Sequence, residues 1–264
     1  MRVAAVQFKA ARGDLEGSRA RSAALAREAA DGADLLVLPE MACTGYVFSS
    51  LGEARRVAEP ADGETFRAWR AVAIERRCWV VGGLPESDGG LLYNSALVID
   101  PEGHLAFTYR KTLLYDADRV WATPGDSGYR RFTTRAGAFG VGICMDLNDP
   151  RFLLWCWRSR LDAIAFPTNW VDEGREVWDY WGARVGGSGA SLVAANTWGE
   201  DRGTAFTGRS AVLERGKVVA YAAATGDAVV RATVGDARRL DEVGGGGDGG
   251  GERDRPRDRG GARS

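Results

Sequence analysis

The stretch Asp34–Tyr46, which reads DLLVLPEMACTGY, sets the architecture of this 264-residue chain. Its first half, Asp34–Pro39, is an apolar run of the length typical of a strand. The segment before it, Leu15–Ala30, is rich in Ala, Arg, Glu and Leu, and this composition predicts a helix. A second apolar run, Arg2–Phe8 (RVAAVQF), precedes that helix. Strand, helix and strand in this order predict an α/β fold.

The alternation continues toward the C-terminus, where it is mixed with hairpins. Turn residues at Asp100–Gly103 and Glu214–Gly216 each separate two apolar runs, which is typical of a hairpin. The pattern predicts a mixed sheet or two sheets with helices outside. The further helices are expected at Thr65–Arg77 and Glu176–Arg184, and the further strands at Cys78–Leu84, Tyr93–Ile99, His104–Tyr109, Phe139–Ile143, Leu161–Phe166, Ser191–Ala195, Ser210–Leu213, Lys217–Ala222 and Ala228–Val234.

The C-terminal segment Gly244–Ser264 differs in composition from the rest of the chain. It is rich in glycine with interleaved Arg, Asp and Glu, and it holds too little apolar surface to offset the entropy of ordering it. We therefore expect one folded domain over residues 1–243 and a disordered tail over residues 244–264.

Composition excludes several classes of protein. The formal net charge is −1, which argues against a general nucleic-acid binder or a protein bound to anionic membranes. No apolar run approaches the roughly 18 to 20 residues that span a bilayer. The N-terminus turns polar too early for a secretory signal, and the four cysteines form no CxxC pair, so we expect a cytoplasmic protein. The single histidine, His104, lies at a predicted turn, so a multi-histidine metal site is not expected.

Three polar residues stand where apolar runs end. Glu40 follows LLVLP, Lys111 follows HLAFTYR, and Cys144 follows FGVGI. Functional groups collect at the carboxyl ends of strands in α/β sheets. A cysteine thiol needs a base or a cation to become a nucleophile at neutral pH, and Glu40 and Lys111 offer both. Each residue also has an ordinary explanation, as a core thiol, a surface lysine or the start of a loop.

The blocks around these residues resemble those of the nitrilase-type carbon–nitrogen hydrolase superfamily. Its Glu, Lys and Cys segments correspond here to LLVLPEMACTGY, YRKTLLYDADRVWATPGD and VGICMDLNDPRF. Four supporting blocks occur in the expected order: VAAVQF, YNSALVIDPEG, FPTNW and FTGRSAVLERGKVV. Together the seven blocks cover roughly residues 1 to 240.

The resemblance implies a four-layer α–β–β–α sandwich, commonly a dimer, that needs no metal or organic cofactor. It implies that Cys144 attacks the substrate, that Lys111 and the backbone N–H of Met145 stabilise the oxyanion, and that Glu40 is the general base. The substrate would be a small amide or carbamoyl compound. Alternatives are a small nitrile, the N-terminal Asn or Gln of a protein, or a non-catalytic role.

The chain departs from the family pattern at three places. Asp118 stands where many members carry a further Glu that positions substrate or assists proton transfer. Gly187 and Ser188 replace a Glu-Asn pair that is typically structural. Met145 precedes Asp146 where members acting on small amides more often have an aromatic residue, and a similar Cys-Met-Asp sequence occurs in amidases of protein N-termini.

Other residues have weaker assignments. Tyr46, Asn169 and Trp170 are candidates for the substrate pocket. Cys43 and Cys156 are expected to be buried structural thiols, and Glu86 is expected in a solvent-facing loop. Four tryptophans are expected in the core or a dimer interface: Trp155, Trp157, Trp178 and Trp181.

Overall fold

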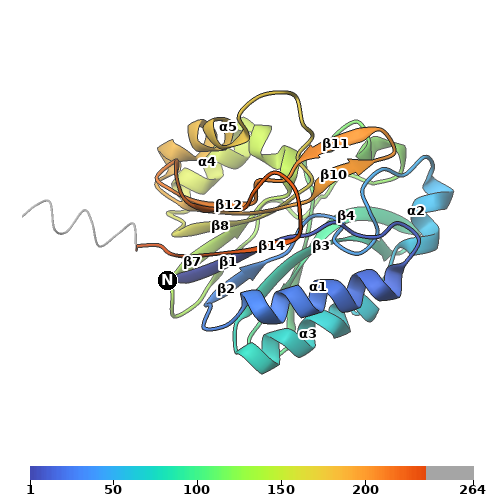
Figure 1. Cartoon of the computed structure of the whole chain (residues 1–264), viewed down its shortest axis with the longest axis horizontal. Helices are drawn as coiled ribbons and strands as arrows, with labels where there is room; N and C mark the ends of the chain where they lie inside the picture. The colour runs from blue at the N-terminus through green and yellow to red at the C-terminus, as the bar shows by residue number, and fades with distance from the viewer. Residues whose placement is uncertain (236–264) are drawn as a thin grey trace, which may run out of the picture.

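Two six-stranded sheets lie face to face in the computed structural model, which describes residues 1–235 (Figure 1). The first sheet has the order β14-β1-β2-β3-β4-β5, in which β1, β2 and β3 are parallel and the other pairings are antiparallel. Its strands are β1 (Arg2–Gln7), β2 (Leu35–Val37), β3 (Trp79–Asp88), β4 (Leu91–Ile99), β5 (Leu105–Arg110) and β14 (Ala228–Thr233).

The second sheet has the order β13-β12-β9-β8-β7-β6, in which β7, β8 and β9 are parallel. A separate two-stranded ribbon, β10 (Trp198–Asp201) with β11 (Thr204–Thr207), projects beyond it. The sheet strands are β6 (Arg131–Thr133), β7 (Ala138–Val141), β8 (Ala163–Thr168), β9 (Ser191–Asn196), β12 (Ala211–Glu214) and β13 (Lys217–Tyr221).

Helices cover the outer face of each sheet. Helices α1 (Leu15–Ala29) and α3 (Glu64–Arg76) pack on the first sheet, whereas α4 (Pro150–Arg158) and α5 (Val177–Val185) pack on the second (Figure 1). Alternate strand residues point to opposite faces, so one set of apolar side chains fills the space between the sheets and another meets the helices. The predicted α–β–β–α sandwich is confirmed.

The predicted strands and hairpins are present, but several elements have weaker sequence signals. These short elements are helix α2 (Leu51–Val57), the three-residue strand β6, and three 3-10 turns, η1 (Asp118–Val120), η2 (Cys144–Asn148) and η3 (Gly186–Ser188). Helix α4 and the ribbon of β10 and β11 were also not predicted. The predicted tail and the boundary at residue 243 lie outside the described residues.

The expectation for Glu86 was wrong. Strand β3 continues to Asp88 and pairs with β4 as far as Leu91, so Glu86 lies within a long hairpin. Its side chain is buried, because it accepts hydrogen bonds from the Arg110 guanidinium at 2.7 and 2.9 Å and from the Ser95 hydroxyl. A paired partner makes burial of this carboxylate possible.

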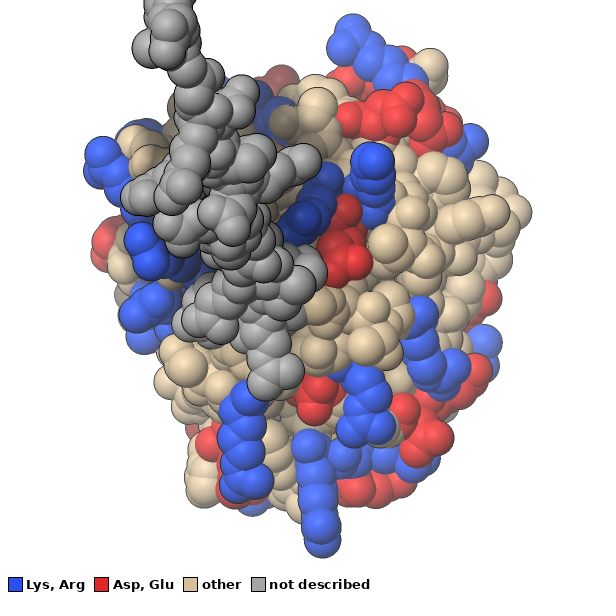
Figure 2. All heavy atoms as spheres, turned by 90° about the vertical axis from the view of Figure 1, so that its left-hand side faces the viewer, with Lys and Arg blue, Asp and Glu red and all other residues tan. Residues whose placement is uncertain are grey.

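The two ends of the sandwich differ in character. The end at which β1 begins faces the viewer in Figure 2, where acidic and basic side chains are interspersed. A broad hollow of about 1050 Å³ lies there, lined by Asp34, Arg77, Trp79 and Arg135 among others. The predicted site residues all lie at the opposite end. No helix within residues 1–235 is long and apolar enough to cross a membrane.

Candidate active site

The candidate site lies where strands of both sheets end. Glu40 follows β2, Lys111 follows β5, Cys144 follows β7 and Asn169 follows β8. Strands β2 and β5 run in the same direction because two antiparallel pairings separate β3 from β5. The parallel strands β7 and β8 supply the other half of the site. The fold therefore brings together residues that lie more than 100 positions apart, as the Asn169–Glu40 contact shows (129 positions).

A fully buried cluster of charges forms the floor of the site. The Lys111 ammonium donates to Glu40 Oε1 at 2.8 Å and to Asp118 Oδ2 at 2.6 Å, and all three side chains are buried. Asn94 Nδ2 donates to both carboxylates, at 2.7 Å to Glu40 and 3.0 Å to Asp118. One ammonium thus serves two carboxylates, and one of its three N–H donors has no assigned protein partner within this cluster.

The backbone around Glu40 is fixed from two sides. Asn169 N donates to Glu40 Oε2 at 2.8 Å, and Asn169 Nδ2 donates to the Glu40 carbonyl at 2.9 Å. Strand β3 approaches so closely at Gly83 that a Cβ there would lie 2.5 Å from the Glu40 Cα. Met41, the next residue, has a φ of 48°, a left-handed conformation that a non-glycine side chain disfavours. The surrounding contacts therefore hold a strained turn behind the carboxylate.

Cys144 begins the η2 turn and has a φ of 43°, also left-handed. A sharp, strained strand-to-turn junction presents a nucleophile to a cleft in many hydrolases. The residue is 92% covered, and it lines a small cavity of about 40 Å³. The predicted pocket residues Tyr46, Asn169 and Trp170 line the same cavity, as does Met145, the predicted oxyanion donor.

Asp146 ties the cysteine turn to the lysine segment. Its carboxylate accepts from Ile143 N at 2.9 Å, from Leu113 N at 2.8 Å and from the Tyr109 hydroxyl at 2.7 Å. One buried side chain therefore joins the backbone just after Lys111 to the backbone just before Cys144. The resemblance singled out this position, and the structure gives it a positioning role.

Burial shifts the pKa values of the site residues. Burial raises the pKa of Glu40, although Lys111 and its hydrogen bond oppose the shift. Burial alone would lower the pKa of Lys111, but the charges of Asp118 and Glu40 outweigh it and hold that pKa well above its usual value. Burial and the charge of Glu40 raise the pKa of Cys144, whereas Lys111 and Thr168 act in the opposite direction. The resting state that follows is a neutral thiol beside an ammonium.

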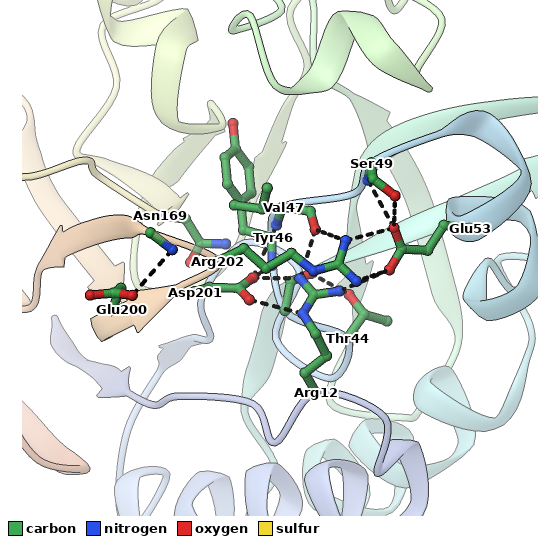
Figure 3. A network of polar contacts seen from close by, with 12 residues as sticks. Arg12, Thr44, Tyr46, Val47, Ser49, Glu53, Asn169, Glu200, Asp201 and Arg202 are labelled. Atoms are coloured by element: carbon green, nitrogen blue, oxygen red, sulfur yellow. Dashed lines mark hydrogen bonds and ion pairs between the residues drawn. The ribbon is translucent and has the colours of Figure 1, made fainter.

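A second ionic cluster holds the segment that carries Tyr46 (Figure 3). Asp201 accepts from the backbone N–H groups of Tyr46 and Val47, each at 3.0 Å, and is paired with Arg12. Arg12 also donates to the Val47 carbonyl at 2.8 Å. Glu53 is paired with Arg202 at 2.6 Å and extends the network toward α2. We call Arg12, Glu53, Asp201 and Arg202 the clamp.

A comparison of the sequence with known protein families agrees with the order of the sequence blocks and with the geometry of the site. Residues 2–239 match the family described as carbon-nitrogen hydrolase. The chain belongs to the carbon–nitrogen hydrolases. Its sequence is 33% identical over 204 residues to a nitrilase of Pyrococcus abyssi, which covers 75% of each chain. It is also 35% identical over 153 residues to an (R)-stereoselective amidase of a Pseudomonas species, which covers 57% of this chain and 53% of the relative.

Solved structures of other carbon–nitrogen hydrolases share the fold. An amidase from Nesterenkonia sp. AN1 superposes with a TM-score of 0.76 at 22% identity, covering 92% of this chain and 93% of that one. In that structure the acetamide moiety of fluoroacetamide is covalently attached to the active-site cysteine. An N-terminal amidase superposes with a TM-score of 0.77 at 16% identity, covering 88% and 97%.

Sequence reasoning alone missed Asn94, which bridges the two carboxylates, and Tyr115, which lines the cavity beside Cys144. Asn94 lay in a quoted block, and a lone amide in an apolar strand was a usable signal. Within residues 1–235, no group of three or more His, Cys, Asp or Glu side chains is placed to hold a metal ion.

Proposed function

We propose that this carbon–nitrogen hydrolase is an amidase that forms a thioester on Cys144. The observation that carries the proposal is a buried glutamate–lysine pair whose charges act on the Cys144 thiol, with Asn169 both lining the cavity beside Cys144 and donating to Glu40. In this proposal Glu40 is the general base and Lys111 stabilises the oxyanion. The steps need only side chains and water, with no metal or organic cofactor.

In the first half-reaction, Glu40 takes the Cys144 proton as the sulfur attacks the amide carbon. The raised pKa values of both groups support a proton transfer that is coupled to attack, since a thiolate is disfavoured at rest. The oxyanion then accepts the unused N–H of Lys111 and the N–H of Met145. Met145 is the second residue of η2, where amides lack partners within the turn. Glu40 returns the proton to the leaving nitrogen, and ammonia departs.

In the second half-reaction, water attacks the thioester while Glu40 accepts its proton. The same oxyanion donors act again, and the proton passes to the departing sulfur. Asp118 acts through Lys111: its carboxylate accepts from the ammonium at 2.6 Å, as Glu40 also does. A shorter side chain than Glu can do this because the η1 turn carries Asp118 up to the lysine.

Two buried polar atoms favour an amide over a nitrile. The Asn169 Oδ1 and Tyr46 hydroxyl atoms are buried and have no hydrogen-bond partner among residues 1–235, and both residues line the cavity beside Cys144. The Asn169 oxygen can only accept, so its natural partner is an N–H donor. An amide group brings one, whereas a nitrile nitrogen carries no hydrogen. Trp170 forms an apolar part of the same wall.

The test is a panel of matched small amides, carbamoyl compounds and nitriles. Ammonia release is followed together with the intact mass of the protein. We expect turnover of amides and an acyl adduct that is absent in Cys144→Ala. Turnover of nitriles without amides would overturn the proposal in favour of a nitrilase. A folded protein that turns over none of them, with no adduct, would support the non-catalytic alternative.

We further propose a homo-oligomer in a reducing compartment such as the cytoplasm. Leu154 and Trp157, three residues apart on α4, are 46% and 59% exposed, and neighbouring exposed apolar side chains are typical of an interface. By contrast, Trp181 is fully buried. The four cysteines are buried and unpaired, as a reducing compartment allows. A monomeric mass in sedimentation would contradict the oligomer.

A further inference from the structure

The cavity beside Cys144 continues into an outer hollow. Four residues line both: Asn148, Trp170, Val171 and Glu173. The inner space measures about 40 Å³ and the outer about 140 Å³. A substrate whose amide reaches Cys144 can therefore extend past these four residues into the outer hollow.

The charge along this path is uneven. Glu173 is the one Asp, Glu, Lys or Arg in the lining of the inner cavity, as far as the described chain extends. Its side chain is exposed and makes no ion pair with any residue among 1–235. Arg175 lines only the outer hollow. Counted outward from Cys144, Glu173 is therefore the first charged side chain in the lining, and Arg175 follows in the outer hollow.

Aromatic side chains form most of the remaining wall. Tyr46, Tyr115 and Trp170 all line the inner cavity. Tyr115 and Glu173 line the same small cavity, and the charge of Glu173 adds to the rise in the Tyr115 pKa caused by burial and by Asp116. The face of an aromatic ring carries partial negative charge, and a carboxylate carries a full negative charge. Both therefore attract a cation that binds between them.

We propose that the site selects amides that carry an ammonium group a few bonds from the scissile carbonyl, with the ammonium held between Glu173 and the aromatic wall. The inference rests on the proposed amidase function and names its substrate class. A carboxylate at the same place in the substrate would face Glu173 and be disfavoured.

Hydrolysis of three amides of similar length tests the inference. β-Alaninamide carries an ammonium where butyramide carries a methyl group, and succinamate carries a carboxylate. Because Glu173 is exposed, an advantage of about tenfold in kcat/KM for β-alaninamide over butyramide is expected from one screened ion pair and one cation–π contact. Glu173→Gln should reduce that ratio several-fold, and Glu173→Lys should favour succinamate. The control is Asp179→Asn on α5, an exposed carboxylate that lines neither cavity.

A second measurement reads charge selectivity without turnover. Iodoacetamides with an ammonium, a neutral or a carboxylate tail share one reactive group, and each rate with Cys144 is divided by its rate with a small free thiol. We expect the ammonium probe to alkylate Cys144 about tenfold faster than the carboxylate probe, by the same ion pair and ring contacts. Glu173→Gln should compress this difference, and Asp179→Asn should not.

The two measurements separate the inference from the function on which it rests. Charge selectivity in alkylation without hydrolysis of any amide would remove the proposed amidase and keep the cation site. Hydrolysis with equal rates for all three amides, or a preference for succinamate set by Arg175, would overturn the cation site and keep the amidase. If none of the three iodoacetamides alkylates Cys144, the cation site is also overturned, since the path to the cysteine would then be closed.

Discussion

Two ionic clusters flank the Tyr46 segment, and they are built on opposite electrostatic principles. In the floor cluster of Glu40, Lys111 and Asp118, one cation faces two carboxylates, and no side chain is exposed. In the clamp, two arginines face two carboxylates, and the side chains are between 15% and 40% exposed. The pKa of Glu40 is raised by burial, whereas hydrogen bonds from Arg202 lower that of Glu53 to about 2.

The difference separates the cluster that we propose for chemistry from one that holds a segment in position. A surplus of negative charge in a buried cluster keeps Glu40 a ready proton acceptor, and it makes the cluster depend on a single lysine. The clamp holds equal numbers of positive and negative charges and is partly exposed to solvent. Each of its ion pairs therefore contributes little by itself to the free energy of unfolding. Glu40 and Asp146, whose pKa values are raised by burial, both lie where the proposed reaction takes place.

Lys111→Met should have the largest effect, because it leaves two buried carboxylates with no cation. Removing one partner of a buried pair costs about 3–5 kcal/mol, so the free energy of unfolding should fall by that amount and turnover should be lost. Chemical denaturation and ammonia release measure the two. An unfolding midpoint equal to that of the native protein would show that the two buried carboxylates do not depend on Lys111.

Lys111→Arg keeps the positive charge and tests whether the compact shape of the ammonium is required for turnover. The planar guanidinium is larger than an ammonium and cannot donate to both carboxylates and an oxyanion from the same point. Loss of one oxyanion donor costs about 10²–10³-fold in kcat, and we expect a decrease of that size in steady-state kinetics. Nearly native turnover in this variant would exclude oxyanion stabilisation by Lys111.

Asp118→Asn removes the surplus charge and should shift the pH profile. The charge of Asp118 raises the pKa of Glu40, so its removal lowers that pKa. A general base must be ionised, and its activity therefore rises with pH through its pKa. The acid limb of kcat/KM should move to lower pH in the variant, while kcat falls because Lys111 is less firmly held. An acid limb that stays in place would assign it to another group.

Asp201→Ala tests the clamp through Tyr46. It leaves the N–H groups of Tyr46 and Val47 without their acceptor, which costs about 1–3 kcal/mol per unsatisfied buried group. We expect KM to rise several-fold with a smaller change in kcat, since the segment positions the pocket wall and not the nucleophile. A decrease confined to kcat would instead connect the clamp to the chemistry.

Arg202→Met should have the smallest effect, about 0.2–1 kcal/mol in the free energy of unfolding at pH 7. The pKa of Glu53 is lowered in the folded state, so its pairing stabilises the protein above the ordinary pKa and is lost as pH falls toward about 2. The native protein and the variant should therefore converge in stability between pH 4.5 and 2. A gap that widens on acidification would contradict the assignment.

Much of the fold and of the candidate site was predictable from local patterns. Runs such as Asp34–Pro39 and Phe139–Ile143 indicate buried strands, and Glu40, Lys111 and Cys144 each follow one. Resemblance then supplied the family, which the comparison confirmed. Helix α2 and the ribbon of β10 and β11 were missed because short elements with polar residues have little periodicity. Glu86 was misplaced because its burial depends on Arg110, a partner on a different strand.

The sequence by itself determined which strands form and which polar residues stand at their ends, because periodicity and composition act over a few residues. Tertiary structure alone decided that Asn94 would bridge two carboxylates, that Asp146 would join two loops, and that Asp201 would hold Tyr46. Those contacts join residues 54, 34 and 155 positions apart. Their energies depend on burial and on strand register, which are properties of the assembled sheets and not of any segment.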